Sequence, residues 1–283
     1  MVSFFGYYAY LTYTRGYAFN YSVDFDGGTQ LRFKFDKQIS SSDIRALLEK
    51  EGWSGATTRE FSYSQEVLIR VKDFSSDVKT VANRIREVIK ASNPDVSVEL
   101  LESESIRPSA VESLRLKSIL ALVLSLLAMM SYIAFRYWSV AFAVGAFVSL
   151  FHDAIVVLAL FLLLDREISV NVIAAVVMLL GYSINDTIVV FSRIRENIEE
   201  MLRLKKQMVF DQIVTLSINQ TLSRTILTSA ATALTAFAML ILGGESLRDL
   251  SLALLVGIVF GTYSSIYIAS SVMMLFHKEE QAL

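Results

Sequence analysis

The sequence predicts a multi-pass α-helical membrane protein that carries one α+β domain outside the bilayer. Three observations lead to this fold class. Hydrophobic residues make up 54% of the 283 residues, the mean hydropathy is +0.49, and the charged residues gather in a few segments with long gaps between them. A bundle of apolar helices that use the bilayer as their solvent accounts for all three observations.

Residues 1–19 are apolar and rich in tyrosine, and we expect a partial first transmembrane helix there. Only about 14 residues precede Arg15, fewer than the ~20 that a full span needs. A signal peptide is the competing interpretation, but no basic residue precedes the apolar run and no small-residue cleavage site follows it. The expected bundle therefore has six helices with the first one truncated, by a late start or by loss of its front.

Residues 20–112 have the patterns of a small α+β domain. Alternation of Leu31, Phe33 and Phe35 predicts a strand, and similar alternation predicts strands over 66–72 and 96–100, with a weaker one over 57–63. Helical patterns cover residues 40–50 and 75–91, and Asn-Pro ends the second. The resulting order, βαββαβ, is that of a ferredoxin-like domain, a scaffold that implies no activity by itself.

Five further apolar segments are each long enough to cross a hydrocarbon layer of ~30 Å at ~1.5 Å per residue. They cover residues 116–135, 140–164, 168–191, 225–242 and 250–276. We therefore assign residues 113–283 to a five-helix transmembrane bundle.

The positive charges of the short loops predict the orientation of the chain. Excess Lys and Arg in short loops marks the cytoplasmic side, which places residues 192–224 in the cytoplasm and residues 20–112 outside the cytoplasmic membrane. Apolar residues at near-helical spacing further predict that 192–224 is an amphipathic helix on the membrane, with a solvated linker as the alternative. The cationic residues of this segment are Arg193, Arg195, Arg203, Lys205, Lys206 and Arg224.

The segment 168–191 places Asn185 and Asp186 inside an otherwise apolar run. An ionisable group in a membrane helix costs on the order of 2.5–3.5 kcal/mol, so it usually faces protein or water and has a function. Asp186 lies about 7 Å inside the cytoplasmic end of its helix at ~1.5 Å per residue, and Arg224 opens the next span at similar depth. A proton relay through Asp186 and Arg224 is one interpretation; for Arg224, a snorkelling interface arginine is the other.

Two other polar features remain open to two interpretations. His152 and Asp153 on the preceding span could extend a proton wire or form a hydrogen bond between packed helices. The pair Gly27 and Gly28 could bend the chain as it enters a strand or cradle a phosphate, but no Lys-Ser/Thr follows, so we expect the bend.

Four separated motifs then resemble the SecF members of the SecD/SecF family of protein-export membrane proteins, in the resistance-nodulation-division superfamily. They cover residues from about 20 to 272, in the order of the family: DFDGGT (24–29), GYSINDTIVVFSRIREN (181–197), TLSRTILTS (221–229) and GIVFGTYSSIYIAS (257–270). The resemblance implies a subunit that uses the proton-motive force to assist export of polypeptides across the cytoplasmic membrane.

The resemblance also implies site residues and partners. Asp186 and Arg224 match the intramembrane charged positions of the family, with Asn185 beside them, and the motif at the entry to the inserted domain supplies Asp24, Gly27, Gly28 and Thr29. The implied partners are a SecD-like membrane protein, the Sec translocon channel, the unfolded exported polypeptide and membrane lipid. Transporters of this superfamily have two six-helix halves, and the sequence contains one, so we expect an obligate heteromer.

Several function classes are disfavoured. A net charge of −2 gives no surface for nucleic acid, and with no Cys neither disulfides nor thiolate chemistry is possible. We expect no cofactor, no metal and no enzymatic activity. Half of a proton-driven small-molecule efflux transporter remains the main alternative, although an insert of about 90 residues is small for one. An intramembrane aspartyl protease would pair Asp153 with Asp186, but Ile-Asn-Asp stands where that class has Gly-x-Gly-Asp.

Overall fold

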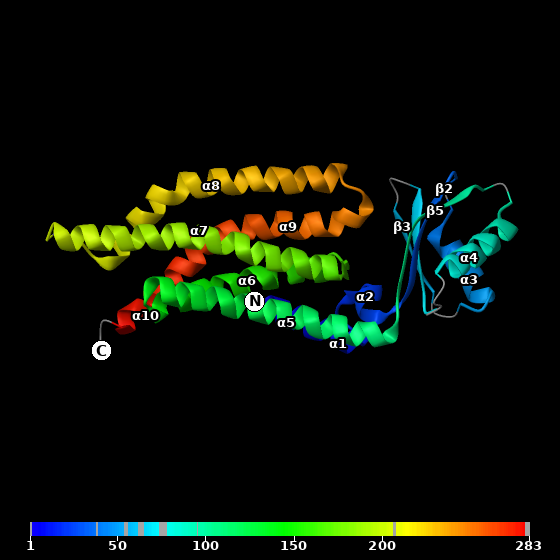
Figure 1. Ribbon diagram of the computed structural model, residues 1–283, viewed down its shortest axis with the longest axis horizontal. Coiled ribbons are helices and arrows are strands. Elements are labelled where there is room, and N and C mark those ends of the chain that lie inside the picture. Colours follow the sequence, from blue (N-terminus) through cyan, green and yellow to red (C-terminus); the bar gives the residue numbers. More distant parts are fainter. Residues whose placement is uncertain are drawn as a thin grey trace. The chain divides into compact units, whose positions relative to one another are not determined.

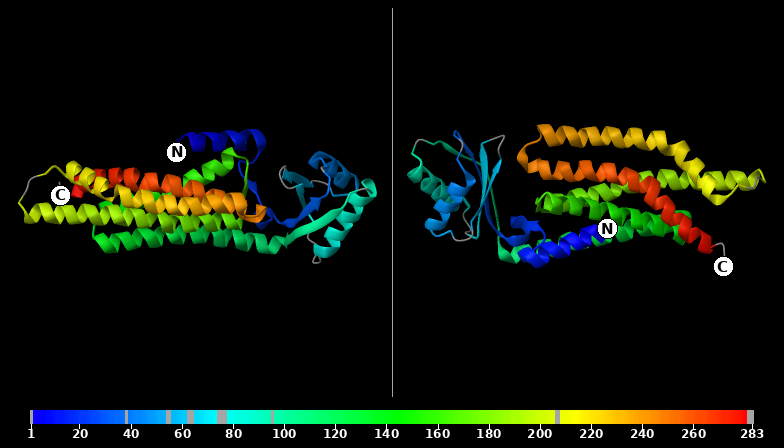
Figure 2. Two further views of the ribbon diagram at one scale, coloured as in Figure 1. Left: turned by 90° about the horizontal axis from the view of Figure 1, so that it is seen from above. Right: turned by 180° about the vertical axis from the view of Figure 1, so that it is seen from behind.

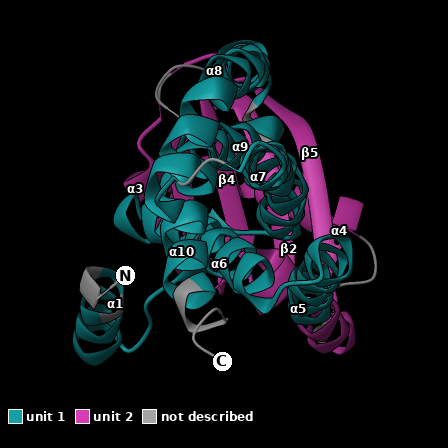
Figure 3. Cartoon of the chain, turned by 90° about the vertical axis from the view of Figure 1, so that its left-hand side faces the viewer, with its two compact units in different colours: residues 1–20, 118–283 teal, residues 21–117 magenta. Residues whose placement is uncertain are grey.

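The computed structural model describes residues 2–37, 39–53, 56–61, 65–73, 78–94, 96–205 and 208–280. The chain divides into two compact units, shown in different colours in Figure 3. Met1–Asn20 and Ser118–Leu283 form the first, which we call the helical unit. Tyr21–Lys117 forms the second, which we call the α/β unit.

Long helices make up the helical unit, and within the described residues five helical segments are long and apolar enough to cross a membrane. The prediction of a mainly helical chain with five such segments is confirmed. The segments are Ser109–Tyr137, Val140–Leu163, Val170–Arg203, Phe210–Leu242 and Leu247–His277.

The elements of this unit follow one another with short connections. They are α1 (Val2–Arg15), α5 (Pro108–Tyr137, which starts in the α/β unit), α6 (Val140–Leu163), the two-residue strand β6 (Glu167–Ile168), α7 (Val170–Arg203), α8 (Phe210–Leu242), α9 (Glu245–Tyr263), the π-helix η1 (Ser264–Ile268) and α10 (Ala269–Glu280). Helices α7, α8 and α9 run alongside one another (Figures 1 and 2).

The segment 192–224 differs from the single amphipathic helix that its spacing predicted. Helix α7 continues to Arg203, and α8 begins at Phe210, so two helix ends share the segment. The Asn197 amide donates hydrogen bonds to Ser217 Oγ at 2.7 Å and to Gln220 Oε1 at 2.9 Å, which joins α7 to α8. Apolar residues that we expected to face lipid, such as Ile194 and Ile213, are buried in helix packing instead. The cytoplasmic location of the segment stays a prediction.

Glycines allow three close helix contacts in the helical unit. A Cβ atom on Gly145 of α6 would lie 2.6 Å from the carbonyl oxygen of Ala269 in α10. A Cβ on Gly257 of α9 would overlap the side chain of Leu179 in α7, and one on Gly261 would reach Ser183 Oγ at 3.4 Å. Small residues that let helix backbones approach are the usual means of packing membrane helices, where no hydrophobic force acts between them.

A four-stranded sheet with two helices on one face forms the α/β unit (Figure 1). Its order in sequence is β2 (Gly28–Phe35), α3 (Ser41–Lys50), β3 (Thr57–Phe61), β4 (Glu66–Val71), α4 (Val78–Ser92) and β5 (Val98–Ile106), preceded by β1 (Asn20–Tyr21) and α2 (Val23–Asp26). The spatial order is β3-β4-β2-β5, and every neighbouring pair is antiparallel. Residues 62–63 and 75–77 of the expected elements lie outside the described residues.

The core of this unit follows the alternation seen in the sequence. Leu31 and Phe33 of β2 stand opposite Ile69 and Val67 of β4, and all four are buried. Ile85 of α4 is fully buried in the same cluster. Burial of such apolar side chains contributes roughly 1.5–3 kcal/mol each. Because alternate residues of a strand point to the same face, this burial determines which face of the sheet the helices cover.

The close contact at Gly145 generates a test of the packing of α6 on α10. Gly145→Ala should lower the free energy of unfolding by about 1–3 kcal/mol, because the new methyl group meets a backbone oxygen that cannot rotate away. Gly181→Ala is the matched control, since its Cβ would find only Met129 Cε at 3.9 Å. Thermal unfolding in detergent measures both; equal stability of the two variants would contradict the contact.

Candidate functional site

Asp186 lies buried between α7 and α8. Its side chain is 2% exposed, and Ser229 Oγ of α8 donates a hydrogen bond to Oδ2 at 3.0 Å. The aliphatic run of α7 carries the residue into the helix bundle, and Ser169 begins that helix by accepting a hydrogen bond from the Val172 amide. A buried carboxylate needs donors of this kind, because an unmatched charge in an apolar interior costs several kcal/mol.

Arg224 of α8 is exposed and lines a pocket of about 370 Å³ between α7 and α8. Within the described residues it forms no ion pair at 4.0 Å or less with Asp186, although its charge acts on that carboxyl group. The other arginine of the pocket, Arg193, is tied to Gln220 at 2.7 Å and to Glu196 at 2.9 Å. Arg224 is therefore the cation of this pocket that is free to change partners.

Asn185 points away from this centre. Its side chain is exposed on the outer surface of α7, and no hydrogen bond joins it to the described part of the chain. Neighbouring positions on a helix face different directions, so the burial of Asp186 and the exposure of Asn185 go together. The structure thus brings Asp186 and Ser229 together but leaves Asn185 on the outside.

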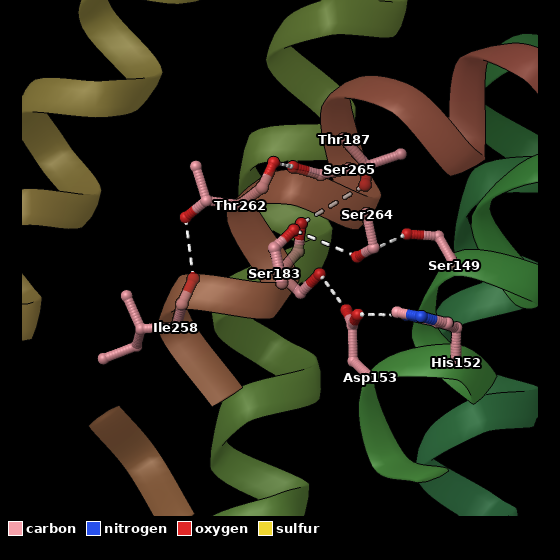
Figure 4. Close-up of polar contacts among 10 residues, drawn as sticks. Ser149, His152, Asp153, Ser183, Thr187, Ile258, Thr262, Ser264 and Ser265 are labelled. Carbon is pink, nitrogen blue, oxygen red and sulfur yellow. Dashed lines mark hydrogen bonds and ion pairs between the residues drawn. The ribbon is translucent and has the colours of Figure 1, made fainter. Parts of the chain in front are cut away.

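A second buried carboxylate, Asp153 of α6, bonds to α7 one turn before Asp186. It is fully buried; Ser183 Oγ of α7 donates to its Oδ2 at 2.6 Å, and His152 Nδ1 lies 3.3 Å from its Oδ1 (Figure 4). The His152 side chain is 20% exposed. The sequence named His152 and Asp153 as a candidate pair, and the structure adds Ser183. Because Ser183 lies three residues before Asp186, one helix contacts both carboxyl groups.

A separate set of hydroxyl bonds joins α6 to η1 near this second centre. Ser149 of α6 donates to Ser264 Oγ at 3.1 Å, and Ser264 donates to the carbonyl oxygen of Gly261 at 3.0 Å (Figure 4). Ser149 lies four residues before Asp153 on α6, and Ser264 is the first residue of η1. Single-turn π-helices inside α-helices are rare and frequently occur at functional sites.

The DFDGGT motif forms a tight corner in the α/β unit. Ser22 caps α2 by accepting from the Asp24 amide, and its hydroxyl donates to Asp24 Oδ2 at 2.9 Å. Gly27 and Gly28 adopt φ values of 75° and 113°, which residues with a Cβ rarely do. A Cβ on Gly28 would also meet the Val71 carbonyl oxygen at 2.6 Å.

Thr29 and Asp24 complete this corner. Thr29 is buried and donates to the Asp73 carbonyl oxygen at 2.6 Å. These contacts and the positive φ angles of Gly27 and Gly28 are those of a backbone bend.

Partial burial, and then the charges of Asp24 and Glu102, raise the pKa of Glu104 above its ordinary value. This edge of the sheet therefore holds protons more readily than separate carboxylates would.

Comparison with known proteins gives a consistent result. The family described as "Protein export membrane protein SecD/SecF, C-terminal" matches residues 85–279. The protein translocase subunit SecF of Thermodesulfovibrio yellowstonii is 36% identical over 92% of this chain and 84% of that protein, and SecF of Vibrio alginolyticus is 38% identical over 89% and 78%. The SecDF subunit of Thermus thermophilus is 36% identical over 93% of this chain but only 35% of its own length.

A solved structure agrees with these relatives. The crystal structure of SecDF, described as a translocon-associated membrane protein from Thermus thermophilus, superimposes with a TM-score of 0.83 at 35% identity. The alignment covers 98% of this chain and 37% of that one.

The hydrogen bond from Ser229 generates a test of the Asp186 centre. Ser229→Ala should lower the free energy of unfolding by about 1–3 kcal/mol, because it leaves a buried carboxyl oxygen without its donor. Thr228→Ala is the neighbouring control, since the exposed Thr228 hydroxyl bonds only to helix carbonyl oxygens. If thermal unfolding gives the same loss for both variants, the hydrogen bond does not support Asp186.

Proposed function

The chain belongs to the SecD/SecF family of protein-export membrane proteins, and we propose that proton binding at Asp186 couples its part in export to the proton-motive force. Relatives named SecF match at 36–38% identity over about nine-tenths of the chain. On that basis the chain is a multi-pass protein of the cytoplasmic membrane and an accessory subunit of the Sec protein translocase. The burial of Asp186 inside a membrane helix is the observation that carries the proton-coupling proposal.

Asp186 supplies the proton-binding step in this proposal. In its neutral form the carboxyl group suits the apolar interior, and Ser229 Oγ donates to one of its oxygens. Loss of the proton creates a buried charge, which draws the nearby Arg224 cation or water from the adjoining pocket toward it. The two protonation states therefore favour two arrangements of α7 and α8, and a proton gradient shifts the population between them.

The energy available is sufficient for such a shift. One proton that moves through 100 mV releases about 2.3 kcal/mol. Since 1.4 kcal/mol corresponds to a tenfold change in an equilibrium constant, this shifts a two-state equilibrium by roughly fifty-fold. Binding and release at a carboxyl group need no catalytic chemistry, so we propose a transport subunit without enzymatic activity and without a cofactor.

We propose that a SecD-like chain covers the exposed polar positions of the helical unit. Relatives that carry SecD and SecF in one polypeptide indicate a SecD partner, and this chain matches about a third of such a protein. Asn185 and Arg224 are exposed on membrane-spanning helices, and polar groups that face lipid are costly. A partner helix with an acceptor for Arg224 would relieve that cost. The Sec translocon channel and the unfolded exported polypeptide are further proposed partners, and lipid surrounds the bundle.

The remaining architecture completes the proposal. The strand order β3-β4-β2-β5 with α3 and α4 on one face supports a ferredoxin-like domain, which we place outside the cytoplasmic membrane. The apolar, tyrosine-rich α1 would be a sixth membrane helix beside the five long segments. The cationic end of α7 would lie in the cytoplasm by the positive-inside rule.

Replacement of one carboxyl oxygen tests Asp186. Asp186→Asn keeps the shape and the hydrogen bond from Ser229 but cannot titrate, so export into inverted membrane vesicles should fall to the rate measured without a proton gradient. Asp211→Asn, the same change at the exposed start of α8, should leave the gradient-dependent rate intact. A gradient-dependent rate in Asp186→Asn equal to that of the parent protein would remove Asp186 from the coupling.

The absence of natural Cys allows a direct test of orientation. Glu87→Cys in α4 and Glu200→Cys in α7 are matched changes at exposed positions. In intact spheroplasts a membrane-impermeant thiol reagent should label position 87 and spare position 200, and disruption of the membrane should expose both. The reverse pattern would overturn the proposed topology.

A further inference from the structure

We propose that Asp153 and His152 form a second proton-binding centre, which Ser183 connects to the helix that carries Asp186. This inference rests on the proposed proton coupling and adds a second group to it. Two side chains one turn apart on α7 bond to two different helices: Ser183 bonds to Asp153 of α6 at 2.6 Å, and Asp186 bonds to Ser229 of α8 at 3.0 Å. Ser183 and Asp186 are about 4.5 Å apart along the helix axis at ~1.5 Å per residue.

The charge balance of the pair explains why it would hold a proton. Asp153 has no exposed surface, so a lone carboxylate there would carry the full cost of burying a charge, several kcal/mol. One proton shared with His152 avoids this cost, because neutral imidazole with carboxylic acid and imidazolium with carboxylate both have zero net charge. Transfer within the pair breaks the His152 Nδ1–H bond and forms the Asp153 Oδ1–H bond, across the 3.3 Å that separates the two atoms.

His152 gives the buried carboxyl group its connection to the surroundings. Its side chain is 20% exposed whereas that of Asp153 is 0% exposed, so protons reach Asp153 through the imidazole. Both residues lie near the middle of α6, which runs from Val140 to Leu163 and is long and apolar enough to cross a membrane. The pair thus combines a sealed inner group with an accessible outer group.

The elements packed around Asp153 bring few other titratable groups near it. Helix α7 contributes Ser183 and, one turn further along, Asp186. The facing part of α9 and η1 contributes Gly261, Ser264 and Ser265, while its tyrosines, Tyr263 and Tyr267, are exposed. From α10, His277 stacks on Phe210 instead. His152 and the hydroxyl of Ser183 are therefore the side-chain groups of the described residues that contact the Asp153 carboxyl group.

The backbone of α9 packs directly against this centre. A Cβ on Gly261 would lie 3.5 Å from Asp153 Oδ2, so the backbone of α9 rests against the carboxyl group without an intervening side chain. The π-helix η1 begins three residues later, and its wider turn is a place where a helix can change its hydrogen-bond register. Ser183, the positioning residue, can alternatively bond back to a carbonyl of its own helix when Asp153 does not accept its proton.

Infrared difference spectra between two pH values, recorded on the SecD-containing complex in lipid bilayers, test the proposal without a transport assay. The parent protein should give carbonyl-stretch bands of two buried carboxylic acids, one from Asp153 and one from Asp186. The Asp153 band should be lost in Asp153→Asn, persist in Asp186→Asn and be unchanged in Ser149→Ala, which removes the hydrogen bond to Ser264 and leaves the pair intact. A spectrum of Asp153→Asn identical to that of the parent overturns the proposal.

Two milder variants keep the test valid if Asp153→Asn fails to fold. His152→Gln and Ser183→Ala retain the carboxyl group, and each should move the pH at which its band is half developed; an unchanged midpoint in both overturns the proposal. Failure of the Asp186 proposal would give a different result. Asp186→Asn would then have the same spectrum as the parent protein, while His152→Gln would still shift the pH midpoint of the Asp153 band.

Discussion

The requirement that polar groups inside a membrane bundle find partners within the protein governs the arrangement of this chain. Helix α7 carries the consequences, because it presents Ser183 to Asp153 on α6 and Asp186 to Ser229 on α8. The glycines at which α9 and α10 approach their neighbours allow backbones to close around these groups without water. Close packing and buried polar groups thus depend on each other. Tightly packed helices can bury a carboxyl group if a hydroxyl group is close enough to donate a hydrogen bond to it.

Much of this architecture could be predicted from the sequence, because its signals are local. Five apolar runs predicted five long helices. Asp186 is the acidic residue of the third run, and this made it a candidate proton-binding residue. The pairing of Asp153 with Ser183 was out of reach, since the two residues are far apart in sequence and meet only through the crossing of α6 and α7. The exposure of Asn185 could not be predicted either, because which face of α7 is covered depends on its neighbours rather than on its own sequence.

The segment 192–224 shows how one pattern can fit two structures. Apolar residues at helical spacing fit a helix that lies on a membrane and also two helix ends that pack on each other. The Asn197 amide, which bonds to Ser217 and Gln220 of α8, decides for the second. In the α/β unit the alternating pattern had one interpretation and gave the strands, but the close approach of Gly28 to Val71 required the register of β2 on β4.

The length of α7 has a mechanical consequence. From Asp186 to its end at Arg203 the helix extends about 25 Å at ~1.5 Å per residue. A tilt of roughly 10° about Asp186 would therefore displace that end by about 4 Å, far more than the movement of the carboxyl group itself. Because Asn197 joins α8 to the same stretch, the two helix ends would move together as one lever arm, and a small rotation near Asp186 would become a much larger displacement at the far end.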